Sequence, residues 1–98
     1  MPAPCAEVGD YFRTNAQGKS RCKAYTAPPS IRGAYLCTLA PDTFIGPVTT
    51  VEYSRRFLTV EVRGYWVNVW RRDNNAHFAR RVSRRMIHQW EENGWQHW

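Results

Sequence analysis

The middle of this chain, from Tyr25 to Val82, is a succession of short apolar runs separated by Pro and Gly. The runs are rich in Val, Thr, Tyr and Trp, which favour β-strands. Pro28 and Pro29 must interrupt a strand, because proline fixes φ and provides no donor for the ladder. The pattern predicts an all-β fold, a small β-barrel of about five strands, and it contains no local catalytic motif.

Two of the runs alternate and predict a hairpin. In residues 57–62 every second side chain is aliphatic, which puts Leu58, Val60 and Val62 on one face. Arg63-Gly64 then forms a tight turn in which Gly64 takes a positive φ. Strict alternation in residues 65–70 gives two faces: Tyr65, Val67 and Val69 on one, and Trp66, Asn68 and Trp70 on the other.

Turn residues bound the other expected elements. Further strands are predicted at residues 11–13, 21–26, 33–39, 44–53 and 76–82. The 44–53 run should bend at Gly46-Pro47. Ser83 can cap a short helix from Arg84 to about Asn93, with Met86, Ile87 and Trp90 on one face.

A chain of 98 residues makes one domain with a single modest core. We expect three parts along it. These are an N-terminal arm (1–20), the barrel (21–82) and a helical, Trp-rich C-terminal tail (83–98).

The net charge of +6 is carried mainly by Arg. Such a charge favours an anionic partner, because it attracts the partner over long range and forms charge-assisted hydrogen bonds with it. Nucleic acid, an anionic wall polymer, a membrane surface and an acidic protein all fit. An excess of Arg also arises in a GC-rich genome, so the charge alone does not select among these partners.

The sequence has three cysteines, Cys5, Cys22 and Cys37. No two of them form a Cys-x-x-Cys pair, which argues against a structural zinc site. In a secreted domain they predict one disulfide and one free or intermolecular thiol. A Cys5–Cys22 bond is the favoured pairing, and it would contribute about 3 kcal/mol. The pairing stays open on sequence alone.

No hydrophobic stretch approaches the ~20 residues that span a bilayer. The start, Met1-Pro2-Ala3-Pro4-Cys5, is typical of a mature secreted chain preceded by an initiator Met. The histidines share no ligand spacing. We therefore expect a secreted protein, and the sequence predicts no cofactor and no metal.

A family resemblance rests on residues 25–28, 36–44 and 64–69. They give a strand that leads into an Ala-Pro turn, a Thr-Leu step, and a Gly-x-Trp-Val-x-Val strand after a hairpin. Together they resemble a bacterial SH3-like (SH3b) domain over about residues 21–82. Asp42 stands where that family often has Gly, and residues 76–80 replace its usual closing Gly-Trp-Val strand. The resemblance implies a non-catalytic module, commonly secreted, that binds cell-wall peptide or another protein.

Aromatic side chains are the first candidate site. In small barrels they form grooves for peptides or sugars, because they offer rigid area for stacking. By alternation about half of them must instead belong to the core. Nearby Arg side chains would hold anionic groups, unless they form an ordinary solvated face. The candidate ligand-binding residues are Tyr53, Tyr65, Trp66, Trp70, Phe78, Arg71, Arg72 and Arg80.

The tail carries three further Trp residues. Because Trp is favoured at protein–protein contacts, Trp90, Trp95 and Trp98 are candidate partner-binding residues. The alternative is that they pack on the barrel and extend a small core.

Catalysis has weak support in the sequence. Glu52 and Glu61 could act as a carboxylate pair with a His, as in small secreted ribonucleases, and His77 and Glu61 are the residues to vary. No motif fixes the proximity of the two carboxylates, and ion pairing with Arg is their ordinary role. We therefore predict a secreted, non-enzymatic binding module for peptidoglycan or an anionic wall polymer. The alternatives are an adaptor subunit of a secreted toxin or inhibitor complex, and a small secreted nuclease or toxin. Nucleic acid is the less favoured partner, and the oligomeric state is open.

Overall fold

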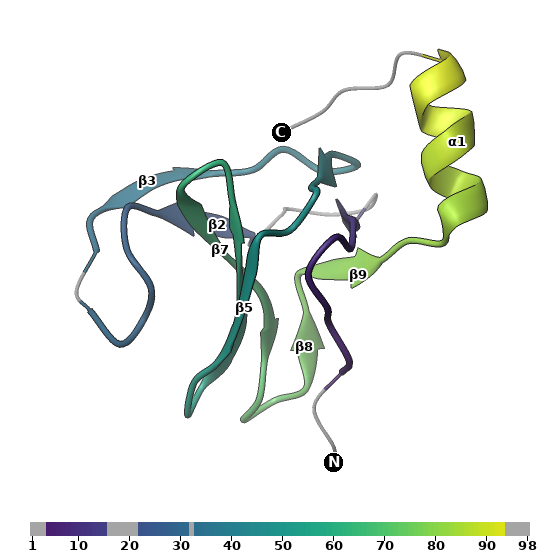
Figure 1. Cartoon of the computed structure of the whole chain (residues 1–98). Helices are drawn as coiled ribbons and strands as arrows, with labels where there is room; N and C mark the ends of the chain where they lie inside the picture. The colour runs from purple at the N-terminus through teal and green to yellow at the C-terminus, as the bar shows by residue number, and fades with distance from the viewer. Residues whose placement is uncertain (1–3, 16–21, 32, 94–98) are drawn as a thin grey trace.

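The computed structural model describes residues 4–15, 22–31 and 33–93. The fold is mostly β, with antiparallel strands in two sheets and one short helix (Figure 1). The strands are β1 (Phe12–Thr14), β2 (Lys23–Tyr25), β3 (Tyr35–Thr38), β4 (Phe44–Ile45), β5 (Thr50–Tyr53), β6 (Phe57–Val62), β7 (Tyr65–Arg71), β8 (Ala76–His77) and β9 (Ala79–Arg81). The helix is α1 (Arg84–Asn93).

The larger sheet has the strand order β3-β2-β7-β6-β5, with β8 paired to β7, and the smaller sheet has the order β4-β1-β9. Each of the two expected strands, 44–53 and 76–82, is divided into two shorter strands: β4 and β5 in the first, and β8 and β9 in the second. Among the described residues, strand pairing closes neither sheet into a ring. The closed barrel expected from the sequence is therefore not found.

Strand β1 comes from the expected N-terminal arm, yet it is the middle strand of the small sheet. Phe12 pairs with Ile45 of β4 and with Arg81 of β9. Both Phe12 and Ile45 are buried in the core. Strand β1, near the N-terminus, thus pairs with a strand from the middle of the chain and with one from its C-terminal part.

The main core combines inward side chains of both sheets. Six of its thirteen members lie on β6 and β7, and the aliphatic ones among them follow the alternation that their patterns predict. Its members are Phe12, Cys22, Ala24, Leu39, Ile45, Val48, Leu58, Val60, Val62, Val67, Val69, Trp70 and Ala79.

The predicted hairpin between β6 and β7 is confirmed. Val62 pairs with Tyr65, and the two turn residues Arg63 and Gly64 both have positive φ, 53° and 85°. Positive φ at both central positions matches the right-handed twist of the flanking strands.

A β-bulge on β7 overturns one part of the sequence prediction. Leu58 lies opposite Trp70 but Thr59 lies opposite Asn68, so Val69 is an extra residue. The bulge turns Trp70 into the core, where it is 1% exposed. The prediction that Trp70 shares the face of Trp66 is therefore wrong.

The predicted helix is confirmed as α1, and it packs on the small sheet (Figure 1). The Ser83 hydroxyl accepts a hydrogen bond from the backbone N–H of Met86 at 3.3 Å, as an N-cap does. Trp90 stacks on Phe44 of β4 with ring centroids 4.6 Å apart, and its ring also meets the Tyr11 ring edge to face. These contacts give the small sheet a second, smaller apolar cluster.

Candidate functional site

The face of the large sheet that points away from the core carries aromatic side chains. On β7, Val67 points inward and Trp66 and Asn68 point outward. The register extends this face, because Tyr25 of β2 lies opposite Trp66 and Thr59 of β6 lies opposite Asn68. Three neighbouring strands therefore share one surface.

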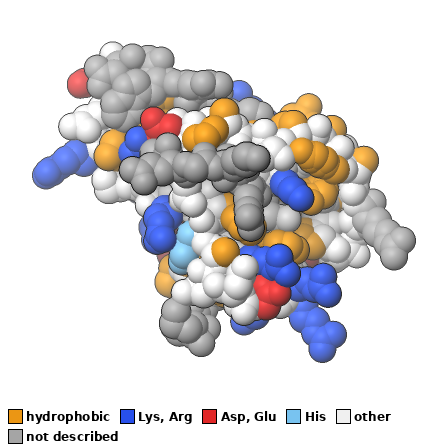
Figure 2. Space-filling view, turned by 180° about the vertical axis from the view of Figure 1, so that it is seen from behind, with side chains coloured by type: hydrophobic (Ala, Val, Ile, Leu, Met, Phe, Trp, Pro, Cys, Tyr) orange, Lys and Arg blue, Asp and Glu red, His pale blue; other side chains and the backbone are white. Residues whose placement is uncertain are grey.

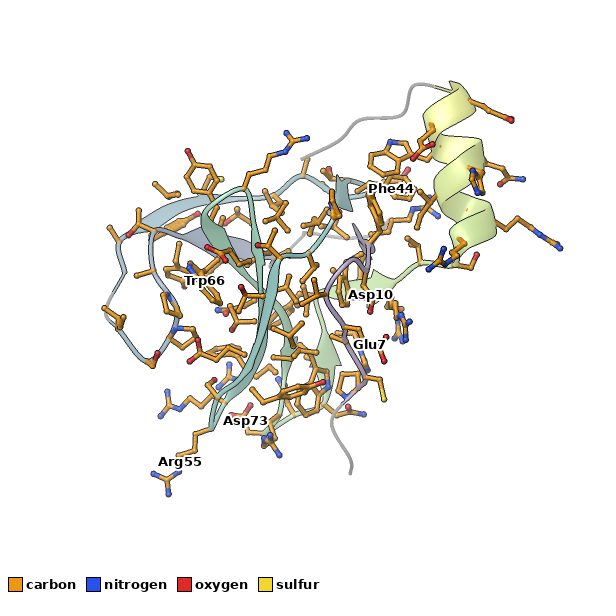
Figure 3. The ribbon with its side chains drawn as sticks, in the orientation of Figure 1. Glu7, Asp10, Phe44, Arg55, Trp66 and Asp73 are labelled. Carbon is orange, nitrogen blue, oxygen red and sulfur yellow. The ribbon has the colours of Figure 1, made fainter. Side chains whose placement is uncertain are left out.

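A cavity of about 200 Å³ lies over this surface. Tyr25, Phe57 and Trp66 give it aromatic walls, and Pro28 and Ile31 line it from the loop between β2 and β3. Figure 3 shows Trp66 on the side of the sheet next to that loop. The Pro-rich segment that interrupts the strand in the sequence thus becomes one wall of the cavity.

The loop is held closed at its base by two hydrogen bonds between Thr26 and Ala34. The N–H of Thr26 donates to the carbonyl oxygen of Ala34 at 3.1 Å, and the N–H of Ala34 donates to Thr26 Oγ1 at 2.8 Å. Gly33 lies so close to Ala27 that an added Cβ would be 2.5 Å from the Ala27 nitrogen. Only glycine allows this approach of the two loop arms.

A second cavity of about 340 Å³ adjoins the first. The two share Tyr25, Phe57 and Asn68 in their walls. We name the two cavities together the aromatic groove. The second cavity adds Lys23, Arg71, Asn74 and Phe78.

Asn68 lies at the floor of the aromatic groove, where the two cavities meet, and it is 6% exposed. The hydroxyl of the buried Thr59 donates a hydrogen bond to Asn68 Oδ1 at 2.8 Å. In the described residues, no fully buried side-chain nitrogen or oxygen lacks a partner. With its oxygen occupied by Thr59, Asn68 has its amide nitrogen left as a candidate donor toward the groove.

The groove carries little net charge of its own. Arg71 binds Asp73 through two hydrogen bonds, Nε to Oδ1 at 2.6 Å and Nη2 to Oδ2 at 2.9 Å. These bonds, with the attraction of the two charges, raise the pKa of Arg71 and lower the pKa of Asp73. Lys23 places its ammonium 5.9 Å from the centre of the Tyr35 ring. Among the described residues that line the first cavity, none is charged.

Three of the eight predicted ligand-binding residues line the aromatic groove: Trp66, Phe78 and Arg71. Their binding role stays a prediction. Tyr53 and Tyr65 are exposed by 48% and 45%, and both lie outside the groove lining. The Tyr53 hydroxyl donates to the carbonyl oxygen of Pro4 at 3.0 Å.

The other three predicted ligand-binding residues lie elsewhere. Trp70 is in the core, because of the bulge at Val69. The Arg72 guanidinium lies 5.6 Å from the centre of the Trp70 ring. Arg80 lines a different cavity, together with His77 and other residues of the core edge.

The basic side chains do not gather in one patch on the face shown in Figure 2, where Lys and Arg occupy several separate places. Arg71 and Arg72 lie at the turn beside β6, since the N–H of Arg72 donates to the carbonyl oxygen of Arg56 at 2.7 Å. Arg80 and Arg81 lie on β9 in the small sheet, where they pair with β1. The two groups therefore belong to different sheets.

Trp90, a predicted partner-binding residue, is 5% exposed and packs on Phe44 and Tyr11. It takes the alternative role considered for the tail, that of a packing residue. Trp95 and Trp98 lie outside the described residues.

The expected Cys5–Cys22 disulfide is not formed. Within the described part of the chain, which includes all three cysteines, no disulfide is present. Cys22 is fully buried in the core, where its thiol lies 3.4 Å from the carbonyl oxygen of Asn68, whereas Cys5 is exposed. Burial, with a smaller effect of Cys37 on the paired strand, raises the pKa of Cys22 to about 12.

The carboxylate and histidine considered for catalysis are held by separate contacts. Glu61 pairs with Trp66 and accepts hydrogen bonds from the hydroxyls of Thr49 and Thr50 at 3.2 and 2.9 Å. His77 pairs with Trp70, four residues further along β7, which corresponds to roughly 13 Å of strand. Desolvation, with the nearby charge of Arg80, lowers the pKa of His77.

Sequence reasoning missed most of the groove as a site. It placed Asn68 on the Trp66 face but gave it no role, and it did not connect Tyr25 or Phe57 with Trp66. The useful signal was a polar residue between aliphatic neighbours on a central strand, because a buried amide needs a hydrogen-bonding reason to be there.

No family model, no curated protein and no solved structure matches this chain. Over the described ranges, no helix is long and apolar enough to cross a membrane. In the same ranges, no group of three or more His, Cys, Asp or Glu is arranged to hold a metal ion.

Proposed function

We propose that this protein is a non-enzymatic binding module for the bacterial cell wall, and that the aromatic groove holds the wall ligand. The observation that carries the proposal is Asn68, a nearly buried amide with its donors available at the floor of an aromatic-walled groove. Binding sites typically combine apolar and aromatic walls with a few well-placed polar groups. The groove has that composition.

Charge favours peptidoglycan over an anionic wall polymer as the ligand. A polyanion requires cations along its path, but Arg71 is already paired with Asp73 and the described lining of the first cavity is uncharged. Neutral sugar rings of the glycan strand suit stacking on Trp66 and Tyr25. The net charge of +6 then serves long-range attraction to the wall.

An SH3-like arrangement is the finer description of the fold that goes with this proposal. Its support is the succession of short antiparallel strands from β2 to β7, with a Pro-containing loop beside the aromatic groove.

Wall binding also implies that the protein is secreted. Its recovery only from the cytoplasm of the native host would contradict that part.

The proposal is tested by co-sedimentation with purified peptidoglycan sacculi at low salt. We expect the wild type to sediment with the sacculi and Trp66→Ala to lose most of this retention, because the ring that forms the groove wall is removed. Tyr65→Ala is the matched control, an aromatic truncation at the neighbouring position outside the groove. Absence of wild-type retention, or equal loss in both variants, would reject the proposal.

One observation favours a second function, an adaptor in a secreted protein complex. Strand β3 lies at the edge of the large sheet, and all four of its residues are exposed. Tyr35 and Leu36 are 50% and 45% exposed, and Ile31 nearby is 63% exposed. Figure 2 shows hydrophobic side chains concentrated on the side of the molecule away from α1, where β2 and β3 lie. An open, apolar strand edge can pair with a strand of another protein.

Capture from the native secretome separates the two functions. A stoichiometric protein partner that is lost with Leu36→Asp but kept with Trp66→Ala would support the adaptor. Retention on sacculi that depends on Trp66 and not on Leu36 supports the wall module.

A further inference from the structure

The described lining of the first cavity is apolar and aromatic apart from Thr59, the Tyr25 hydroxyl, the Trp66 indole N–H and the Asn68 amide. Of these groups the Asn68 amide is fixed in orientation, because Oδ1 accepts from Thr59 at 2.8 Å. The walls around it come from Trp66, Pro28 and Ile31. A complementary ligand carries a carbonyl oxygen with a small apolar group beside it.

The floor of the groove does not suit a peptide backbone. The strands β2, β7 and β6 each have a paired neighbour on both sides, in the order β3-β2-β7-β6-β5. Their backbone N–H and C=O groups are therefore used within the sheet. An extended peptide that crossed this face would leave most of its own amide groups without backbone partners.

An acetamido group on a sugar fits the same features better. Its carbonyl oxygen can accept from the Asn68 amide, its methyl group can lie against Pro28 and Ile31, and the apolar face of the sugar ring can stack on Trp66. The hydroxyl groups of the ring can remain in water. The cavity volume of about 200 Å³ is of the size of one hexosamine residue.

We infer that the aromatic groove recognises an N-acetylated hexosamine, with the acetamido group bound at Asn68. The inference rests on the proposed function, since it names the part of the wall that the groove binds. It assigns Asn68 as the residue that distinguishes an acetamido group from a hydroxyl, and Thr59 as the residue that positions the amide.

The test compares two neutral ligands with the same β-1,4-linked backbone, tetra-N-acetylchitotetraose and cellotetraose, by isothermal titration calorimetry. They differ in having an acetamido group or a hydroxyl at C2 of each ring. We expect the full chain to bind the N-acetylated ligand about tenfold more tightly or better, because cellotetraose lacks both the acceptor and the methyl group. Equal affinities would overturn the inference, and this comparison needs no protein variant.

Protein variants then locate the selectivity. Asn68→Ala should reduce the preference for the N-acetylated ligand to nearly nothing, and Thr59→Val should reduce it partly. Gln89→Ala truncates an exposed amide side chain on α1, outside the groove, and should leave the preference unchanged. A preference that survives Asn68→Ala in a folded variant would overturn the inference.

Failure of this inference and failure of the proposed function give different results. Retention on sacculi with no selectivity between the two tetrasaccharides rejects the inference and keeps wall binding. Selective binding of the N-acetylated tetrasaccharide without retention on sacculi rejects wall binding and keeps the sugar specificity.

Discussion

The thiol of Cys22 is withdrawn from chemistry by its place in the core. It is fully buried, and its pKa of about 12 keeps it protonated at neutral pH. Because the thiolate is the reactive form, this residue is protected both by its burial, which blocks reagents, and by its protonation. Cys5 and Cys37 are exposed on the surface.

We expect iodoacetamide at about pH 8 to label two thiols in the folded protein and three after unfolding. Only in the unfolded chain is Cys22 accessible, with a pKa in the usual range of a cysteine. Intact mass measures the number of adducts. Cys22→Ala should take two adducts in both states. Labelling of Cys5 only after reduction would show that the disulfide does form in solution.

His77 has a pKa below its ordinary value of 6.5, because desolvation and the charge of Arg80 disfavour its protonated form. The unfolded chain therefore binds a proton at this residue more readily than the folded protein does. We expect the contribution of His77 to stability to be present above pH 6.5 and to be lost as the pH falls below that value.

Urea unfolding at several pH values measures this effect. The decline of the wild-type midpoint on acidification should be smaller in His77→Gln, which cannot be protonated. His88→Gln is the control, an exposed histidine on α1. Identical pH profiles for the wild type and His77→Gln would contradict the expectation.

The loop between β2 and β3 depends on the close approach of Gly33 to Ala27. An added Cβ at Gly33 would lie 2.5 Å from the Ala27 nitrogen and 2.9 Å from its carbonyl oxygen, so the loop arms would have to separate. We expect Gly33→Ala to weaken the proposed wall binding about tenfold, which corresponds to 1.4 kcal/mol, because Pro28 and Ile31 would move away from the groove. Binding to sacculi measures the change.

Ser30→Ala, at an exposed position in the same loop, is the control and should bind as the wild type does. Normal binding by Gly33→Ala would show that the loop wall does not contribute.

Helix α1 contacts the small sheet through Trp90, which stacks on Phe44. We expect Trp90→Ala to lower the free energy of unfolding by about 3 kcal/mol or more, because a large buried ring is removed. Gln89→Ala, one position earlier and exposed, should change it by less than about 0.5 kcal/mol. Chemical denaturation measures both, and a small effect of Trp90→Ala would return this residue to the candidates for partner binding.

Elements with strong local signals could be predicted from the sequence. The 57–62 alternation, the Arg63-Gly64 turn and the Ser83 cap depend on nearby residues, and the structure confirms them. The position of Trp70 could not be predicted, because the bulge at Val69 depends on how β6 and β7 pair. The alternation of apolar and polar residues along β7 does not reveal that Val69 is an extra residue.

In the molecule as a whole, part of the basic charge lies away from the aromatic groove. The aromatic groove lies on the outward face of the large sheet, whereas Arg80 and Arg81 lie in the small sheet.

Two features of the whole chain could not be predicted from the sequence. The first is the placement of β1 between β4 and β9, which joins segments more than sixty residues apart and needs tertiary structure to be seen.

The second feature is the composition of the site. Trp66 and Phe78 were predicted from their residue type, but the groove also needs Tyr25 and Phe57 from other strands and the loop around Pro28. Strand order brings these residues together, and strand order is a property of the long-range pairing. The pairing of Arg71 with Asp73 is likewise seen only in the structure, and it reduces the charge that the groove carries.

The most direct test of wall binding through the aromatic groove is a titration of ¹⁵N-labelled protein with soluble muropeptides, followed by heteronuclear NMR. The side-chain amide of Asn68 and the indole N–H of Trp66 report on the groove itself. We predict that these two signals shift with saturation, together with the backbone signals of Tyr25 and Phe57. Shifts confined to β9 and α1, or to β3, with the signals of Asn68 and Trp66 unchanged, would contradict it.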